Sequence, residues 1–182
     1  MKNYTLIESM STTELTNSWD ITCMQSEETG RDKSIEAMLN WMDSDCTDLT
    51  IKSNPLKCSV DMDCTCLKDG QKIEWCVEVK EYTHPQYDPE KTCYTICLKD
   101  WKIKKMKEHS KERPLYFFAI MYGYVYCWNL GKMNWDNITL ENRYQKVVQT
   151  DPNSEWRYYP TWNIPINTAH RIYKIGGQNN GN

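Results

Sequence analysis

The segment CSVDMDCTCLKDGQKIEWCVEVK, residues 58–80, decides the fold because two strand-forming runs flank an Asp-Gly pair. Asp-Gly between two such runs is a strong signal for a β-hairpin with a two-residue turn. The sequence therefore predicts one strand over residues 58–67 and a return strand over residues 72–80. A turn centred on Asp69 and Gly70 sets the pairing of every residue across the hairpin.

Side chains alternate between the two faces of a strand, so this hairpin has one face that is entirely apolar. That face fixes the register, because a slip by one residue would expose all of it to water. The apolar face consists of Cys58, Val60, Met62, Cys64, Cys66, Ile73, Trp75, Val77 and Val79. The opposite face consists of Ser59, Asp61, Asp63, Thr65, Lys72, Glu74, Cys76, Glu78 and Lys80.

The polar face brings charged groups together in a pattern that suits a metal site. In the expected register Asp61 lies opposite Glu78, and Asp63 lies opposite Cys76. A three-residue turn would instead place the aspartates and Glu78 on different faces. Three carboxylates beside the ammonium of Lys80 are groups that bind Mg²⁺ and assist hydrolysis. The alternative is a solvated face, since charged residues on one side of an antiparallel hairpin often only face water.

The chain has 182 residues and a net charge of −3, which indicates one domain over residues 1–182 and excludes a uniformly basic nucleic-acid-binding protein. Charge is nevertheless uneven along the chain. Residues 99–113 hold seven lysines and arginines against three acidic residues, a local charge of +4. Such a basic stripe suits phosphate groups, although lysine-rich helices more often only present a solvated face.

The nine cysteines are an odd number, and their context favours reduced thiols. Residues 1–8 lack the apolar run of a signal peptide, and no stretch reaches the roughly 18 apolar residues of a membrane span. These observations predict mostly structural cysteines, a cytoplasmic location and no membrane partner. A structural zinc site is disfavoured, because Cys64 and Cys66 are too closely spaced and the pair Cys93 and Cys97 lacks a second half.

The segments around the hairpin complete a mixed pattern of helices and strands. Apolar residues at helical spacing predict a helix over residues 31–42, and a looser pattern predicts a second helix over residues 92–109. The apolar run 115–121 is typical of a buried strand, and a further strand over 124–128 follows a Tyr-Gly turn. This order of helix, hairpin strands, helix and strand indicates an α/β fold with a mixed sheet.

The order of these elements, with acidic residues and a lysine on the hairpin, resembles the PD-(D/E)XK, or restriction-endonuclease-like, nuclease superfamily. The likeness covers about residues 31–130 and leaves residues 131–182 as a C-terminal extension. Within this core the chain is similar to small phage and bacterial nucleases and to archaeal Holliday-junction resolvases. The resemblance implies a restriction-endonuclease-like core, in which a mixed β-sheet of αβββαβ order is flanked by helices.

The resemblance also implies a metal-binding role for four residues. Asp61 or Asp63 would be the metal-binding aspartate, with Asp61 favoured because it faces Glu78 directly. Glu78 would be the second acidic ligand, with the carbonyl of Val79 near the same ion. One departure from the family pattern is that no proline directly precedes either aspartate, which leaves the choice between them open.

The remaining roles concern catalysis and substrate. Lys80 would orient or deprotonate the attacking water, and Glu36 would be the acidic residue often found on the first helix of this family. The resemblance implies a Mg²⁺- or Mn²⁺-dependent endonuclease of phage or mobile-element origin, acting on DNA in the bacterial or host cytosol, with RNA left open as a substrate. Family grounds also favour a homodimer, because cutting two strands favours two active sites. The alternative is a catalytically inactive module of the same fold that binds nucleic acid or protein.

Overall fold

The computed structural model of the chain describes residues 4–8, 18–42, 45–55, 58–82, 85–88, 90, 92–146 and 153–176, without the side chains of 18–27 and 86–88. The helices are α1 (Ser18–Trp41) and α2 (Asp100–Ser110), with short 3-10 turns η2 (Trp135–Asn137) and η3 (Ile166–Thr168). The first strands are β1 (Tyr4–Ile7), β2 (Cys46–Ser53), β3 (Met62–Lys68), β4 (Gln71–Glu81), β5 (Gln86–Asp88) and β6 (Cys93–Lys99). The later strands are β7 (Leu115–Met121), β8 (Tyr124–Asn129), β9 (Thr139–Lys146), β10 (Trp156–Pro165) and β11 (Arg171–Lys174).

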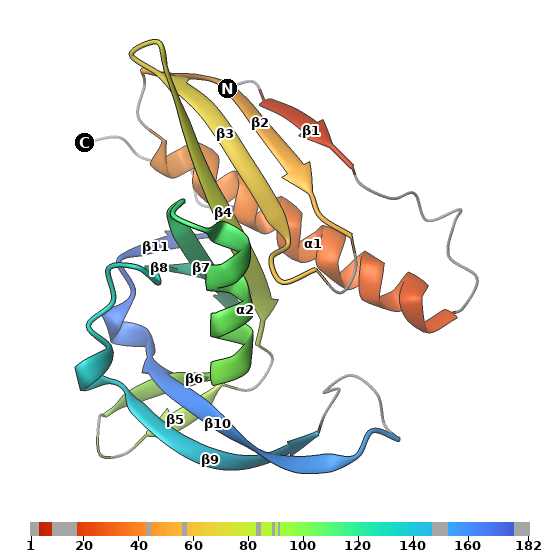
Figure 1. Cartoon of the computed structure of the whole chain (residues 1–182), viewed down its shortest axis with the longest axis vertical. Helices are drawn as coiled ribbons and strands as arrows, with labels where there is room; N and C mark the ends of the chain where they lie inside the picture. The colour runs from red at the N-terminus through yellow and green to blue at the C-terminus, as the bar shows by residue number, and fades with distance from the viewer. Residues whose placement is uncertain are drawn as a thin grey trace.

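Over the described residues these elements form a mixed α/β structure with two sheets (Figure 1). The larger sheet has seven strands in the order β1-β2-β3-β4-β7-β8-β11, and the smaller has four in the order β5-β6-β10-β9. Within the larger sheet β4 pairs in parallel with β7, and its other neighbour β3 runs antiparallel. The strands predicted over 115–121 and 124–128 are confirmed as β7 and β8, to within one residue.

The predicted hairpin is confirmed as β3 and β4. Its turn consists of Asp69 and Gly70, whose φ angles are 52° and 75°. Positive φ at both positions is the geometry of the two-residue turn that matches the twist of antiparallel strands, and glycine adopts it without steric cost. Beyond the turn Asp63 pairs with Cys76, so the register is the predicted one.

The first strand of the hairpin is shorter than predicted. The prediction over residues 58–67 begins too early, since β3 starts at Met62. The backbone N–H of Cys58 donates to the carbonyl of Pro55 at 3.0 Å, so the chain turns before it enters the sheet. As a result Val60 is fully buried on the α2 side of the sheet, and its predicted place on the apolar face is wrong.

Different helices cover the two faces of the hairpin. The apolar face packs against α1, where Met62, Cys64 and Val77 are fully buried. The polar face is covered by α2, which lies between the large sheet and the small sheet, and Glu78 there exposes only 7 % of its surface. The alternative of a solvated face is therefore wrong for this part of the hairpin.

Both helices differ from their predicted bounds. Helix α1 begins at Ser18 rather than at residue 31. The segment 92–109 is not one helix, because it forms strand β6 as far as Lys99 and only then α2. Strand β6 pairs with β5 and with β10. Because β10 is more than 50 residues further along the chain, the local sequence of β6 does not reveal this pairing. Neither described helix is long and apolar enough to cross a membrane.

The junction between the two sheets depends on Asp100, the first residue of α2. Its Oδ1 accepts a hydrogen bond from the indole Nε1 of Trp162 on β10 at 2.9 Å, and its Oδ2 lies 2.7 Å from the Nζ of Lys104. The hydrogen bonds from Lys104 and Trp162 lower the pKa of Asp100. A carboxyl whose pKa is depressed on folding adds stability above its unfolded pKa, and this stability is lost as the pH falls through the folded pKa.

We therefore expect Asp100→Ala to lower the free energy of unfolding at pH 7 by about 1.5–3 kcal/mol, the usual contribution of hydrogen bonds to a charged group. The difference from the wild type should shrink as the pH falls below 4, because the wild-type carboxylate then becomes protonated. Urea unfolding at both pH values measures this effect. Asp136→Ala, at an exposed acidic position on η2, is the control and should change stability by less than about 0.5 kcal/mol. A loss at Asp100 that does not depend on pH would contradict the role of the charge.

Candidate metal centre

Two acidic side chains meet where β3 and β4 run side by side. Asp61 directly precedes β3, and its backbone N–H donates to the carbonyl of Val77 at 3.0 Å. The backbone N–H of Val79 in turn donates to Oδ2 of Asp61 at 2.6 Å. This bond holds the carboxylate of Asp61 against β4, on the same face of the sheet as Glu78.

Glu78 is the most deeply buried acidic side chain of the hairpin. Its Oε1 lies 2.9 Å from the Nζ of Lys102, which reaches down from α2. Its Oε2 is buried as well and accepts no hydrogen bond from an N–H or hydroxyl of the described residues, whereas the carboxyl of Asp61 lies within hydrogen-bonding reach of Glu78. The two carboxyls can therefore share a proton or a cation.

The electrostatics of the pair agree with this geometry. Burial raises the pKa of Glu78 well above its ordinary range, and the nearby charge of Asp61 raises it further. Burial also raises the pKa of Asp61, although the hydrogen bond from Val79 and the charge of Lys102 act in the opposite direction. Two desolvated carboxyls in contact favour holding a proton, so a bound cation would release the proton and stabilise both charges.

Lys80 extends the same face of β4 beyond Glu78. Burial lowers the pKa of the Lys80 ammonium, whereas the charge of Glu78 acts to raise it. Its Nζ lies 5.0 Å from the ring centroid of Tyr82, and the hydroxyl of Tyr82 donates to the backbone carbonyl of Cys97 on β6 at 3.0 Å. The structure thus brings Asp61, Glu78 and Lys80 into one group on the side of the larger sheet that α2 covers.

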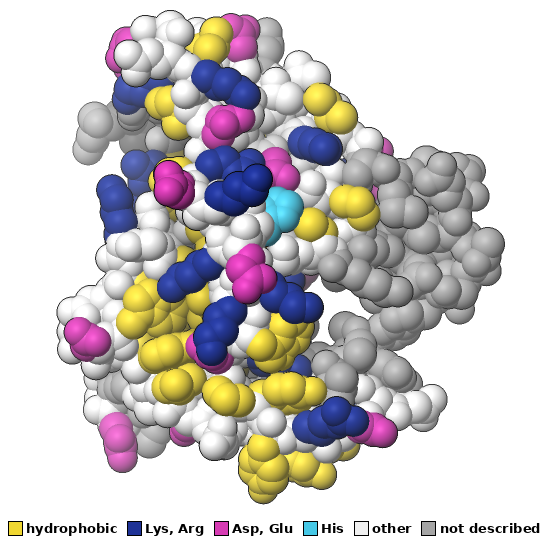
Figure 2. Space-filling model, viewed as in Figure 1, with side chains coloured by type: hydrophobic (Ala, Val, Ile, Leu, Met, Phe, Trp, Pro, Cys, Tyr) yellow, Lys and Arg dark blue, Asp and Glu magenta, His cyan; other side chains and the backbone are white. Residues whose placement is uncertain are grey.

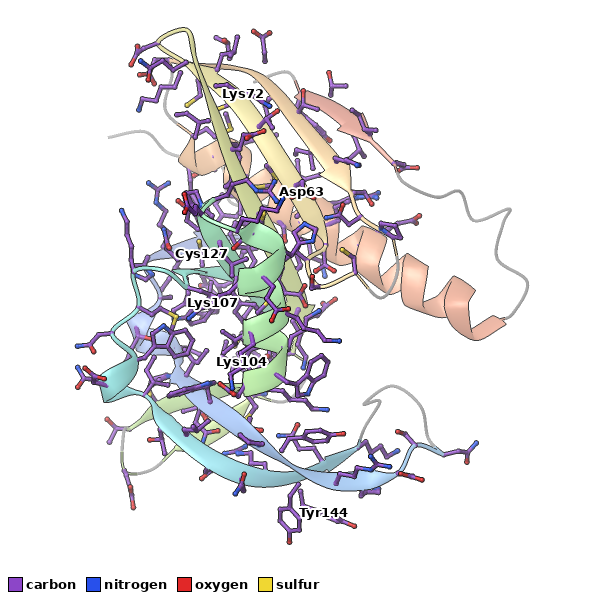
Figure 3. The ribbon with its side chains drawn as sticks, in the orientation of Figure 1. Asp63, Lys72, Lys104, Lys107, Cys127 and Tyr144 are labelled. Atoms are coloured by element: carbon purple, nitrogen blue, oxygen red, sulfur yellow. The ribbon has the colours of Figure 1, made fainter. Side chains whose placement is uncertain are left out.

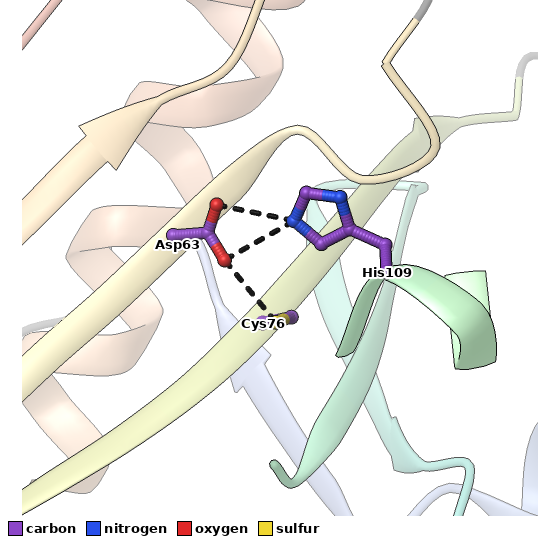
Figure 4. A group of neighbouring side chains, drawn as sticks. All are labelled: Asp63, Cys76 and His109. Atoms are coloured by element: carbon purple, nitrogen blue, oxygen red, sulfur yellow. Dashed lines mark hydrogen bonds and ion pairs between the residues drawn. The ribbon is translucent and has the colours of Figure 1, made fainter. Parts of the chain in front are cut away.

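Asp63 belongs to a separate cluster at the C-terminal end of α2 (Figure 3). Its carboxylate accepts from the Nδ2 of Asn54 at 2.9 Å and lies 2.8 Å from Nη1 of Arg113. The Sγ of Cys76 and the Nε2 of His109 also contact it, at 3.3 and 3.2 Å (Figure 4). Burial alone would raise the pKa of Asp63, but the bonds from Asn54, Cys76 and His109 outweigh it, and the pKa is lowered.

The cluster of Asp63, Cys76 and His109 is the one group of three ligand-type side chains within 4.8 Å of one another in the described part of the chain. A thiol and an imidazole are ligands typical of zinc rather than of Mg²⁺. The guanidinium of Arg113 already balances the charge of Asp63, and Sγ of Cys58 lies 3.8 Å from Nδ1 of His109. The side chains of this cluster therefore satisfy one another, and they tie the end of α2 to the hairpin.

The structure brings together only part of the predicted set. Asp61 and Glu78 lie together, whereas the contacts described for Asp63 are with other partners, among them Arg113 and His109. Glu36 lies on α1, on the opposite side of the large sheet, where its Oε1 accepts from the hydroxyl of Tyr173 at 2.6 Å. The structure assigns Val79 a backbone N–H bond to Asp61.

The basic stripe of residues 99–113 divides in the structure. Lys102 points inward to Glu78 with 23 % of its side chain exposed, whereas Lys104 exposes 71 %. Lys105 and Lys107 are exposed too, and basic side chains follow α2 across the surface in Figure 2. No sequence motif marks Lys102 or His109, because both reach the hairpin from a helix whose rotation is set by packing.

Comparisons with known proteins add no name to this site. No protein-family model matches the chain, and searches of the curated proteins and of the solved structures returned no match.

Proposed function

We propose that the protein is a divalent-cation-dependent nuclease with a restriction-endonuclease-like core. The observation that carries the proposal is the close pair of desolvated carboxyls, Asp61 and Glu78, which lies beside Lys80. The element order supports it, since α1 precedes the antiparallel strands β2, β3 and β4, and α2 precedes β7, which lies parallel to β4. This is the αβββαβ order that the resemblance implies, with β5 and β6 inserted before α2.

The donor set fits a hard cation. Asp61 and Glu78 would hold Mg²⁺ or Mn²⁺ through carboxylate oxygens, with waters and substrate oxygens completing the shell. Such an ion lowers the pKa of a bound water and stabilises the charge that develops on a phosphate. Asp63 is not assigned to this ion, because Arg113 and His109 engage its carboxylate. Lys102 offsets the negative charge of Glu78 in the free protein and lies close enough to meet an incoming phosphate.

Lys80 is the residue proposed to act on the nucleophile. A lysine whose pKa is lowered by burial gives up its proton more readily near neutral pH, which suits proton transfer from a water. The bond from the Val79 N–H fixes the carboxylate of Asp61, so that the site is oriented before substrate arrives. The exposed lysines of α2 would contact the phosphate backbone, which positions DNA or RNA without reading its sequence.

Two further parts of the proposal follow from the sequence. The eight described cysteines are free thiols, as suits a protein of the bacterial or phage-host cytosol. A homodimer would place two such sites on the two strands of a duplex. The alternative, a module that binds without turnover, draws support from the ion pair between Lys102 and Glu78, which already balances one of the two carboxylates.

Cleavage of supercoiled plasmid and of labelled single strands in Mn²⁺ tests the proposal. We expect the wild type to cut and Lys80→Met to cut about 10²- to 10⁴-fold more slowly, the usual contribution of a proton-transfer group. Methionine retains the length of the buried stem, so the variant should fold. Lys72→Met is the matched control, because Lys72 lies on the same strand with 63 % of its side chain exposed. No cleavage by the wild type in either Mn²⁺ or Mg²⁺ would favour the binding module, and equal rates in both variants would indicate a contaminant.

A further inference from the structure

Strands β9 and β10 form a ribbon that extends past the end of the small sheet (Figure 1). The last residue of β6, Lys99, pairs with Thr161. The part of β10 from Trp156 to Pro160 pairs only with β9 among the described strands. This overhang is therefore a two-stranded ribbon, and such ribbons need something to pack against because they are only marginally stable alone.

Three aromatic side chains gather on the overhang. Tyr144, Trp156 and Tyr158 expose 57, 51 and 70 % of their surfaces. The ring of Tyr144 contacts both others across the ribbon, 5.4 Å from Trp156 at an interplanar angle of 29° and 5.0 Å from Tyr158 at 40°. Figure 3 shows Tyr144 pointing away from α2, and hydrophobic side chains gather at this end of the molecule in Figure 2. An exposed group of large rings of this kind marks an interaction surface.

Basic groups accompany the rings. The Nζ of Lys146 lies 5.9 Å from the ring centroid of Trp156, and the Nζ of Lys99 lies 4.4 Å from that of Tyr159. Lys146 lies on the same face of the ribbon as the three rings, because it pairs with Trp156 and side chains alternate along a strand. Lys99, Arg143 and Arg157 lie on the opposite face, where Arg143 and Arg157 bind Glu141 and Glu155. A cation beside exposed aromatic rings suits a polyanion that also has flat rings to stack.

The ribbon is connected to the candidate metal centre. Nη1 of Arg143 on β9 contacts the Sγ of Cys97 on β6 at 2.8 Å. The backbone carbonyl of Cys97 accepts from the hydroxyl of Tyr82, whose ring lies beneath the Nζ of Lys80. The face of the ribbon that adjoins the candidate metal centre is therefore the one opposite the three rings.

We propose that Tyr144, Trp156 and Tyr158 form a stacking platform for unpaired bases, so that the nucleic acid that the protein binds carries a single-stranded segment. The identity of the ligand as nucleic acid rests on the proposed function, whereas the platform itself rests on the rings and cations of the ribbon. Stacking on aromatic side chains tolerates any base, because every base has a flat π-face. Bases in an intact duplex are already stacked on one another and gain nothing from these rings.

Fluorescence anisotropy in EDTA tests the platform without cleavage. The probes are a short labelled oligo-dT strand and a blunt duplex of the same length. We expect the triple variant Tyr144→Ala, Trp156→Ala, Tyr158→Ala to bind the single strand at least about tenfold more weakly and the duplex within about twofold of the wild type. Trp156→Phe keeps a flat ring and should remain within about threefold on the single strand. The control is Tyr122→Ala, which removes a ring with 59 % exposure on the turn between β7 and β8 and should change neither affinity.

The outcomes separate this proposal from the nuclease proposal. Equal losses on the single strand and the duplex, or no loss on either, would overturn the platform. A wild-type dimer that the triple variant converts to a monomer, with unchanged affinity for both probes, would also overturn it and assign the rings to contact between two copies. Ring-dependent binding of the single strand without metal-dependent cleavage would support the platform and contradict the nuclease proposal. Metal-dependent cleavage, with single-strand binding that does not depend on the rings, would support the nuclease proposal and contradict the platform.

Discussion

Asp61→Asn will reduce Mn²⁺-dependent cleavage at least about 10³-fold, which corresponds to about 4 kcal/mol of lost transition-state stabilisation. Asparagine keeps the size of the side chain and still accepts the hydrogen bond from the N–H of Val79. What it removes is the negative charge that would share a cation with Glu78. The backbone around the site should therefore stay in place while the affinity for the ion falls.

Asp63→Asn provides the matched comparison, because it makes the same chemical change two residues away on the same face of the hairpin. Its carboxylate contacts Arg113 and His109, so its loss should lower the free energy of unfolding, by about 1–3 kcal/mol. Cleavage per folded molecule should stay within about tenfold of the wild type, because Asp63 is not assigned to the ion. A tenfold loss corresponds to only about 1.4 kcal/mol of transition-state stabilisation. Rates on a labelled strand, corrected for the folded fraction by circular dichroism, measure both effects. The assignment fails if Asp63→Asn loses as much activity as Asp61→Asn.

Glu78→Gln should make the metal-free protein more stable while it abolishes cleavage. Burial and the neighbouring charge of Asp61 make the ionised form of Glu78 costly, and glutamine removes that cost while it still accepts a hydrogen bond from Lys102. The unfolding free energy at pH 8 should rise relative to the wild type, since at that pH the wild type carries the cost of the ionised, desolvated carboxylate. If Glu78 served only to stabilise the fold, Glu78→Gln would instead lower the free energy of unfolding.

The pH dependence follows from the same shift. A carboxyl whose pKa is raised on folding binds more protons in the folded state, so the stability of the metal-free protein falls as the pH rises from about 4.3 through the raised pKa. Glu78→Gln should flatten this decline, because one of the two carboxyls with raised pKa values no longer titrates. Urea unfolding in EDTA between pH 5 and pH 8 measures it.

The stabilisation by a bound cation should differ between the wild type and the Glu78→Gln variant. A Mn²⁺ concentration of about 100 times the dissociation constant should stabilise the wild type by about 2.7 kcal/mol, or raise its melting temperature by about 5–10 °C. The Glu78→Gln variant should shift by less than about 2 °C, because one of its two acidic ligands is gone. Equal shifts in both proteins would mean that the cation binds elsewhere. The control is Glu155→Gln at an exposed position on the ribbon, which should respond like the wild type.

The sequence could predict the hairpin and the residues on its polar face because each depended on local chemistry. The Asp-Gly turn and the strict alternation of residues fixed a register in which Asp61 approaches Glu78, and the structure has that register. Alternation could not reveal that the chain turns at Pro55 before it enters the sheet, so Val60 was expected on the wrong face. It also could not say that a helix rather than water covers the polar face.

The parts that could not be predicted depend on contacts between distant segments. Glu36 fits the acidic position of the first helix by its place in the chain, yet its carboxylate binds Tyr173, which lies 137 residues further on. The strand character of residues 93–99 depends on pairing with β10, and the inward aim of Lys102 depends on how α2 packs between two sheets. Neither leaves a spacing or a motif that a single sequence displays.

The parallel pairing of β4 with β7 has a consequence for biosynthesis. A ribosome synthesises β3 and β4 well before it reaches Leu115, where β7 begins. Until then the backbone groups on one side of β4 have no neighbouring strand to pair with. During that interval β4, which carries Glu78 and Lys80, is an edge strand, and Lys102 is synthesised only after β4 is complete. Charged side chains on an edge strand disfavour its pairing with the same strand of another copy. We therefore expect the same residues to disfavour aggregation of the growing polypeptide before α2 covers them.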